Sequence, residues 1–230
     1  MITEVLLASA VLISALGHNF QPTINTPSAS LVEQKRVLAE HELDLTNRLP
    51  NEYGNQIFAD NILLTIHFLK GDVESLRLTS NKSSWANFDW EKIRQPFEAS
   101  LTLESGEVFA YHDTILPEFS QLTLKTTNAH YTLREGYKPL SGLPGNGVCH
   151  LASLINWVAR DAGLEVTAKV NHDFYPVPGV PRENGTSIRW GPNGEYNSRN
   201  QNLYVKNNFE VPITFNFKAE LNSVLLVIQK

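Results

Sequence analysis

Cys149 and His172 are the two residues whose types and spacing most clearly suggest chemistry. Cys149 is the one cysteine of the sequence, and it follows a glycine-containing loop at residues 144–147. The apolar residues after it recur at intervals of three and four up to Gly163, which predicts a helix. Free N–H groups and the positive dipole end at a helix start stabilise a thiolate or an oxyanion. The pattern therefore predicts a nucleophilic thiol with a lowered pKa.

A thiol nucleophile needs a nearby base, and the next predicted element supplies an imidazole. Residues 164–172 alternate as a strand does and end at His172. A strand after a helix can return the chain to the helix start, so we expect His172 to accept the proton of Cys149. We expect Asn202 to orient the imidazole. Asp173 ranks second because it would point to the opposite face of the strand.

Further residues near this segment have predicted binding roles. Four backbone N–H groups are the predicted oxyanion donors, those of Gly145, Asn146, Gly147 and Val148. His150 is predicted to line the cleft, and Arg189 to bind a substrate carboxylate. The structural alternatives are a small buried cysteine at Cys149 and ordinary hydrogen-bonded or exposed roles for His172, Asn202 and Arg189. The order of loop, cysteine, helix, strand and histidine leaves the two interpretations of Cys149 evenly balanced.

The sequence gives little support for a metal site, a cofactor site or nucleic-acid binding. One cysteine excludes a site built from several thiolates, and the histidines of the second half lack zinc-ligand spacing, namely His112, His130, His150 and His172. The formal charge of -5 and the pI of about 5.8 do not provide the basic surface that phosphates require. We therefore expect no metal, no cofactor and no nucleic-acid partner.

The chain is expected to contain one main domain after an N-terminal extension. The uncharged stretch at residues 5–16 makes residues 1–17 a predicted signal peptide or membrane anchor, and residues 18–31 a predicted linker. No Lys or Arg precedes the stretch, so a buried element is the alternative. Residues 32–103 are expected to be mainly β. Within them, the apolar run at 62–69 fits either a buried strand or a helix turn.

The predicted fold class is α+β, mainly antiparallel β-sheet with one central helix that starts at Cys149. Strands are predicted at residues 37–45, 99–104, 202–205, 211–217 and 223–228. The proline-rich residues 175–181 are expected to lie outside any central strand.

Several segments together resemble the VanW-like family. They are residues 145–150 (GNGVCH), 161–164 (DAGL), 171–172 (NH) and 177–178 (VP), with 106–111 upstream and 202–208 downstream. The resemblance covers residues 104–230. Three positions depart from the family pattern: Asn146 replaces a glycine, His150 replaces a frequent glutamine, and Asn202 replaces an aspartate.

The resemblance implies a bacterial cell-envelope protein, exported or anchored through residues 1–17, of a family named for an accessory protein of vancomycin-resistance clusters. Some members are regarded as cysteine L,D-transpeptidases. By analogy, Cys149 would attack a peptidoglycan stem peptide, with His172 as base, to give a thioester that an amine or water resolves. A non-catalytic wall-binding or scaffold protein and a thiol peptidase or amidase are the alternatives. The oligomeric state stays open.

Overall fold

Two four-stranded sheets and two long helices make up the part of the chain that the computed structural model describes, residues 35–78, 86–192 and 196–230. Clustering of contacts assigns them to one compact unit. The predictions for residues 1–17 and 18–31 lie outside the described residues.

The first sheet pairs early and late strands of the chain. Its order is β1-β8-β7-β2 and all neighbours are antiparallel, with bounds β1 Val37–Asp44, β8 Ser223–Gln229, β7 Ile213–Ala219 and β2 Phe97–Leu103. Alternate side chains are buried, as for Val224, Leu226 and Ile228 of β8, each with an exposure of 0%. The four strands predicted here are confirmed, with small shifts at their ends.

The second sheet is shorter and mixed. Its order is β4-β3-β6-β5, with bounds β4 Leu124–Thr126, β3 Val108–Ala110, β6 Tyr204–Lys206 and β5 Glu165–Thr167. β3 and β4 run parallel, and the other pairs run antiparallel. Two mostly antiparallel sheets with few helices confirm the predicted α+β class.

The helix α1 (Glu52–Lys70) corrects the expectation that residues 32–103 are mainly β. The side chain of Asn51 caps its first turn by accepting from the N–H of Gly54, and Gly71 ends it in a left-handed conformation. The ambiguous run at 62–69 lies inside this helix. Its side chains are buried nearly all round, so the sequence has no polar face to reveal a helical period.

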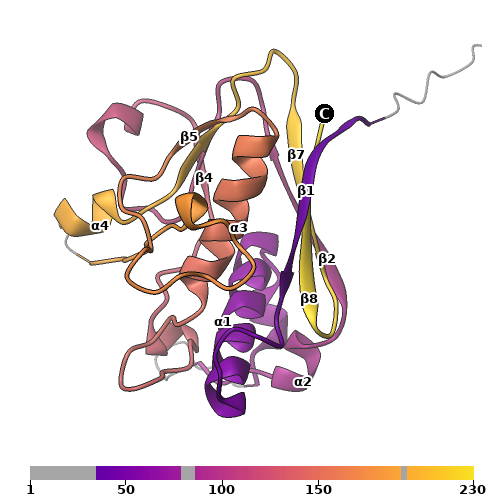
Figure 1. The fold of residues 1–230 in the computed structure, drawn as a ribbon, viewed down its shortest axis with the longest axis vertical. Coiled ribbons are helices and arrows are strands. Elements are labelled where there is room, and N and C mark those ends of the chain that lie inside the picture. Colours follow the sequence, from indigo (N-terminus) through magenta and orange to yellow (C-terminus); the bar gives the residue numbers. More distant parts are fainter. Residues whose placement is uncertain (1–34, 79–85, 193–195) are drawn as a thin grey trace, which may run out of the picture. The chain divides into compact units, whose positions relative to one another are not determined.

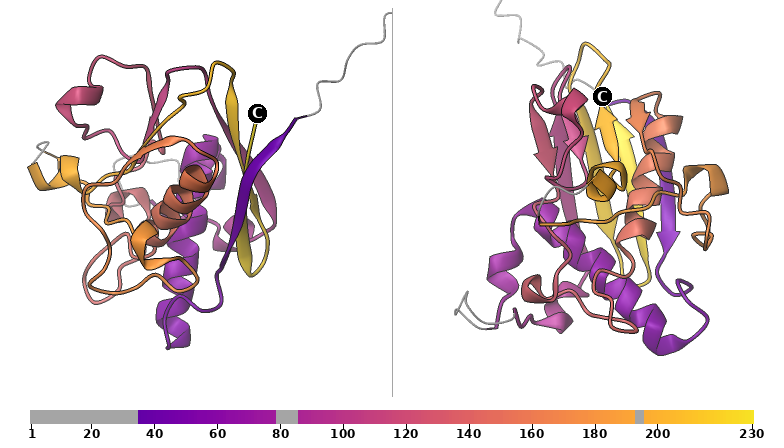
Figure 2. Two further views of the ribbon diagram at one scale, coloured as in Figure 1. Left: turned by 45° about the horizontal axis from the view of Figure 1, so that its top comes forward. Right: turned by 90° about the vertical axis from the view of Figure 1, so that its left-hand side faces the viewer.

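The second long helix is α3 (Val148–Asp161), which confirms the helix predicted at Cys149. Gly163 has a φ of +78° just beyond its C-cap, as predicted. Figures 1 and 2 show α1 and α3 on the same face of the first sheet, where α1 contacts β2 and α3 contacts β1 and β8. The prediction of one central helix is therefore corrected to two neighbouring helices.

Residues 164–172 form less strand than predicted, because only β5 at Glu165–Thr167 pairs with β6. The backbone after β5 bonds to a later segment instead, since the N–H of Ser187 donates to the carbonyl of Val170. Residues 175–181 contain no strand, as expected.

The remaining elements are short: η1 (Val73–Leu76), α2 (Trp90–Ile93), η2 (Pro117–Phe119), η3 (Leu133–Glu135), η4 (Arg182–Asn184) and α4 (Tyr196–Asn200). In the described ranges, no helix combines the length and the apolar character needed to cross a bilayer. The first sheet contains strands from both sides of the predicted boundary between residues 103 and 104, so the two regions share one core.

Candidate active site

Close approach of the two helices positions the loop before Cys149. Gly147 has a φ of +101°, and a Cβ there would lie 2.5 Å from the carbonyl oxygen of Phe58 in α1. Gly145 has a φ of +76°, and its Cβ would lie 2.9 Å from the Cβ of Tyr131. Both positions therefore require glycine, for conformation and for space.

Side-chain hydrogen bonds hold the same loop from behind. The buried amide of Asn61 donates to the carbonyl oxygens of Asn146 and Lys138, each at 2.9 Å. The hydroxyl of Tyr111, which is fully buried, donates to the carbonyl of Val148 at 2.9 Å. The loop is thus held in place before any substrate is present.

Only some of the predicted oxyanion donors are free of hydrogen bonds to the rest of the described backbone. The N–H of Val148 donates to the carbonyl of Gly145 at 3.2 Å, which engages it in the turn and corrects its predicted role. Within the described residues, no backbone acceptor is found for the N–H groups of Asn146, Gly147 or Cys149. These three groups are the ones that the loop leaves for an oxyanion.

The thiol of Cys149 lies against the backbone of Ile188. The N–H of Ile188 donates to Sγ at 3.3 Å, and its carbonyl oxygen lies 3.7 Å from Sγ. Burial raises the pKa of the thiol to about 11, and the Ile188 N–H offsets this only in part. This direction is opposite to the lowered pKa that the sequence predicts, because burial outweighs the hydrogen bond from Ile188, although the side chain is only partly buried.

His172 has a defined tautomer. Its Nδ1 lies 2.7 Å from the carbonyl oxygen of Tyr175, and a carbonyl only accepts, so Nδ1 carries the proton. Nε2 is left with its lone pair, and it has no hydrogen-bond partner among the described residues. The side chain is 8% exposed. This is the protonation state that a general base requires.

Residues 184–188 connect His172 to α3. Ser153 of α3 accepts from the N–H of Thr186 at 2.9 Å and donates to the carbonyl of Cys149 at 2.7 Å. On its other side, the segment bonds to residues 170–171 through Ser187. The ring of His172 lies 6.1 Å from the ring of His150, at 90°. His172 thus lies beside the first turn of α3, and its role as the base for Cys149 stays a prediction.

Asn202 does not orient His172, which corrects that prediction. Its Oδ1 accepts from the N–H groups of His112 and Leu203, and its Nδ2 donates to the carbonyls of His112 and Thr114 and to the hydroxyl of Tyr204. These bonds use the whole amide to tie β6 to the loop after β3. The second choice, Asp173, is exposed. The carbonyl of Tyr175 takes the orienting role instead.

His150 is enclosed, with an exposure of 1%, so it does not line an open cleft as predicted. It packs edge-on against Phe58, with ring centroids 4.9 Å apart, and neither ring nitrogen has a hydrogen-bond partner. Burial lowers the pKa of His150 to about 3, with smaller contributions from the charge of Arg48 and from the protonated form of His172. Sequence reasoning missed Arg48, which lies far from α3 in the chain and carries no motif.

Arg189 is exposed and directly follows Ile188. Its N–H donates to the carbonyl of Gln201, and its own carbonyl accepts from Ser198. Its predicted contact with a substrate carboxylate stays a prediction.

Two other histidines are occupied elsewhere. His130 lies within 3.2 Å of both Asp113 and Glu135 and stacks near Trp190. His112 is buried, and desolvation lowers its pKa to about 4. Across the described ranges, no group of three or more His, Cys, Asp or Glu side chains is arranged to hold a metal ion.

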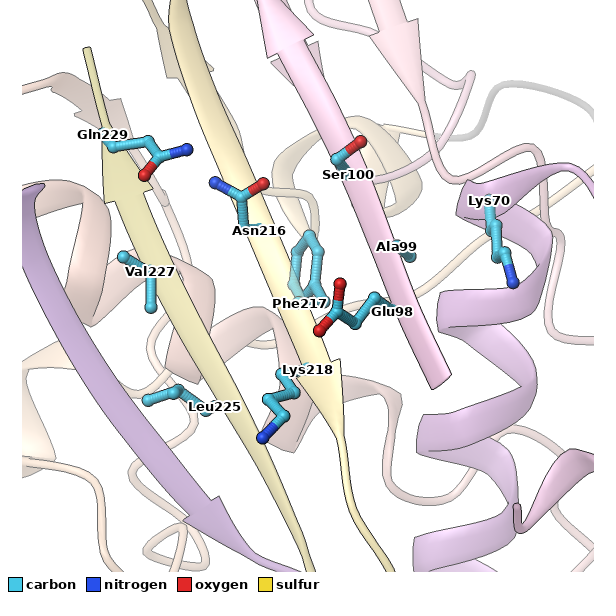
Figure 3. A pocket seen from close by; sticks show the side chains of 10 residues that line it. All are labelled: Lys70, Glu98, Ala99, Ser100, Asn216, Phe217, Lys218, Leu225, Val227 and Gln229. Carbon is cyan, nitrogen blue, oxygen red and sulfur yellow. The ribbon is translucent and has the colours of Figure 1, made fainter. Parts of the chain in front are cut away.

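A concavity on the outer face of the first sheet lies apart from Cys149. Figure 3 shows its lining, which consists of Lys70, Glu98, Ala99, Ser100, Asn216, Phe217, Lys218, Leu225, Val227 and Gln229. None of these described residues is a cysteine or histidine. The surface therefore offers polar and apolar contacts but no thiol or imidazole.

Comparison with known proteins assigns a family. A family model described as VanW like protein matches residues 99–228, which include Cys149 and His172. No curated protein and no solved structure gives a match. Because the matched region spans more than half of the 230 residues, the chain belongs to the VanW-like family.

Proposed function

We propose that this protein is a cysteine acyltransferase of the cell envelope that acts on peptidoglycan stem peptides. The observation that carries the proposal is the tautomer of His172, whose free Nε2 belongs to a ring placed beside the first turn of α3. Membership of the VanW-like family supports the envelope setting.

The raised thiol pKa favours general-base catalysis over a resting thiolate–imidazolium pair. As Sγ of Cys149 attacks the carbonyl carbon of the third stem-peptide residue, Nε2 of His172 takes the thiol proton. The scissile C–N bond then breaks, and His172 returns the proton to the leaving amine. The products are a free amino acid and a thioester on Cys149.

The second half of the reaction regenerates the enzyme. An amine of another stem peptide, or water, attacks the thioester carbonyl and gives its proton to His172, the C–S bond breaks, and the proton returns to sulfur. An amine gives a cross-link, and water gives a shortened peptide. The free N–H groups of Asn146, Gly147 and Cys149 are the proposed oxyanion donors in both halves.

The decisive experiment uses purified full-length protein with disaccharide-tetrapeptide muropeptides, followed by liquid chromatography and mass spectrometry. Wild-type protein is expected to form cross-linked dimers or shortened peptides and an acyl adduct on the intact protein. Cys149→Ala should form none, and His172→Gln should be strongly slowed. His41→Gln is the matched control, because His41 lies on β1 and contacts Asp161 at the far end of α3. Equal product yield from wild type and Cys149→Ala would refute the proposal.

The partly buried thiol, whose pKa is raised, favours one other function, a non-catalytic wall-binding role in which Cys149 is structural. Cosedimentation with purified sacculi tests it. Binding that persists in Cys149→Ala, together with no product from the wild type, would support the wall-binding role. Shortened peptides without cross-links would indicate a thiol peptidase instead.

A further inference from the structure

Arg48 is a buried cation without a partner. It lies between β1 and α1 with an exposure of 1%, and its Nε and Nη1 have no hydrogen-bond partner. Among the described residues, no carboxylate forms an ion pair with it. A charged side chain removed from water is costly unless it is paired, and natural proteins rarely leave one unpaired. Its Nε and Nη1 are therefore available to an anion.

The backbone holds Arg48 at this position. Oδ1 of Asn55, in the first turns of α1, accepts from the N–H groups of Arg48 and Leu49, and Nδ2 of the same side chain donates to the carbonyl of Leu45 at 3.0 Å. The short segment between β1 and α1 is thus tied to the helix at both of its ends. Arg48 cannot easily leave its buried position without breaking these bonds.

A second unpartnered group lies on the neighbouring helix. Asn55, which bonds the backbone of Arg48, precedes Phe58 by about one turn of α1, and the ring of Phe58 packs against His150 with centroids 4.9 Å apart. Both ring nitrogens of His150 lack hydrogen-bond partners among the described residues, at an exposure of 1%. Burial and the charge of Arg48 lower the pKa of His150 to about 3, so the neutral ring can donate one N–H. Asp44 acts electrostatically on Arg48, but it is exposed and bonded to Thr46.

We propose that Arg48 and His150 form a buried subsite for the carboxylate of the leaving amino acid. This inference rests on the proposed function. His150 directly follows Cys149, and the ring of His172 lies 6.1 Å from its own. The α-carboxylate of an amino acid leaving group is two bonds from the scissile nitrogen, so a group held beside the nucleophile can reach it. Guanidinium binds carboxylate through paired N–H groups, and low exposure strengthens that attraction.

The test measures binding rather than turnover, using full-length Cys149→Ala protein and three probes: D-alanine, its neutral amide D-alaninamide, and chloride. Calorimetry or competition should give D-alanine at least a tenfold tighter affinity than D-alaninamide. Arg48→Met should abolish this preference. Arg36→Met, which removes an exposed arginine, should retain it.

A second readout does not depend on how a variant folds. In protein with isotope-labelled histidine, D-alanine should shift the imidazole signals of His150 and leave those of His130 unchanged. Equal affinity for D-alanine and D-alaninamide, or no shift at His150, would overturn the subsite. A response to chloride equal to that to D-alanine would also overturn it, as an adventitious ion only. If the wild type forms product from muropeptides but the preference for D-alanine over D-alaninamide does not depend on Arg48, the subsite alone is refuted. If that preference depends on Arg48 but no product forms, the proposed catalysis alone is refuted.

Discussion

Substitution of Gly147 by alanine is expected to weaken the contact between α1 and α3 and to lower the free energy of unfolding by about 2–4 kcal/mol. Two terms contribute. An alanine at a φ of +101° adopts a strained backbone, which costs about 1 kcal/mol. Its Cβ would also lie 2.5 Å from the carbonyl oxygen and 3.0 Å from the Cα of Phe58, and moving a packed helix backbone costs about 1–3 kcal/mol more.

Gly106→Ala separates these two terms. Gly106 has a φ of +79°, but no atom lies within 4 Å of an added Cβ, so only the strain of about 1 kcal/mol applies. Urea unfolding of both variants at neutral pH gives the comparison, and the alkylation rate of Cys149 in Gly147→Ala reports any shift of α3. Equal losses of stability in the two variants would refute the role assigned to the contact with Phe58.

Four further predictions concern the site. Alkylation of Cys149 by iodoacetamide should rise about tenfold per pH unit from pH 7 towards its pKa of about 11; a plateau below pH 8 would contradict the burial effect. His172→Gln should slow acyl transfer by about 10²–10⁴-fold while thermal unfolding changes little; unchanged turnover would exclude it as the base. Asn202→Ala should cost about 1–3 kcal/mol in urea unfolding and leave alkylation unchanged; an altered alkylation rate would restore its link to the site. Since buried His112 and His150 have lowered pKa values, the unfolded chain binds more protons below about pH 6.5, so unfolding free energy should fall as pH drops; a replacement of both by phenylalanine that leaves this slope unchanged would refute the cause.

The helices show what sequence patterns can and cannot predict. α3 has one apolar face and one partly polar face, so its period is visible. α1 has no such face in its second half, because the polar residues Asn61 and Thr65 are as buried as Ile62. Asn61 and Thr65 find hydrogen bonds inside the protein, which no local pattern predicts.

The sequence predicts those parts of the site that follow from the order of residues along the chain. It does not predict those that depend on contacts between distant segments. The loop and Cys149 follow one another in the chain, which allowed the helix start at Cys149 to be predicted, whereas the pairing of Cys149 with His172 stays a prediction. The group that orients His172 is a backbone carbonyl, and any residue type can supply that. The segment of Arg48 is linked to His150 only through α1, where Asn55 holds the backbone of Arg48 and Phe58 packs against His150, contacts between distant parts of the chain.

The pairing of β1 with β8 also has a consequence for the order of folding. β1 occupies an edge of the first sheet, and its neighbour among the described strands, β8, is made only after all the other strands and helices described. Until Ser223–Gln229 emerge, the segment that carries Arg48 has no sheet to join, and the inner face of β1 stays open to water. Strands that pair over such a long sequence separation fold slowly. Until the pairing is complete, the nascent chain exposes apolar surface of the kind that chaperones bind. The helix with the cysteine can form early, but its surroundings assemble last.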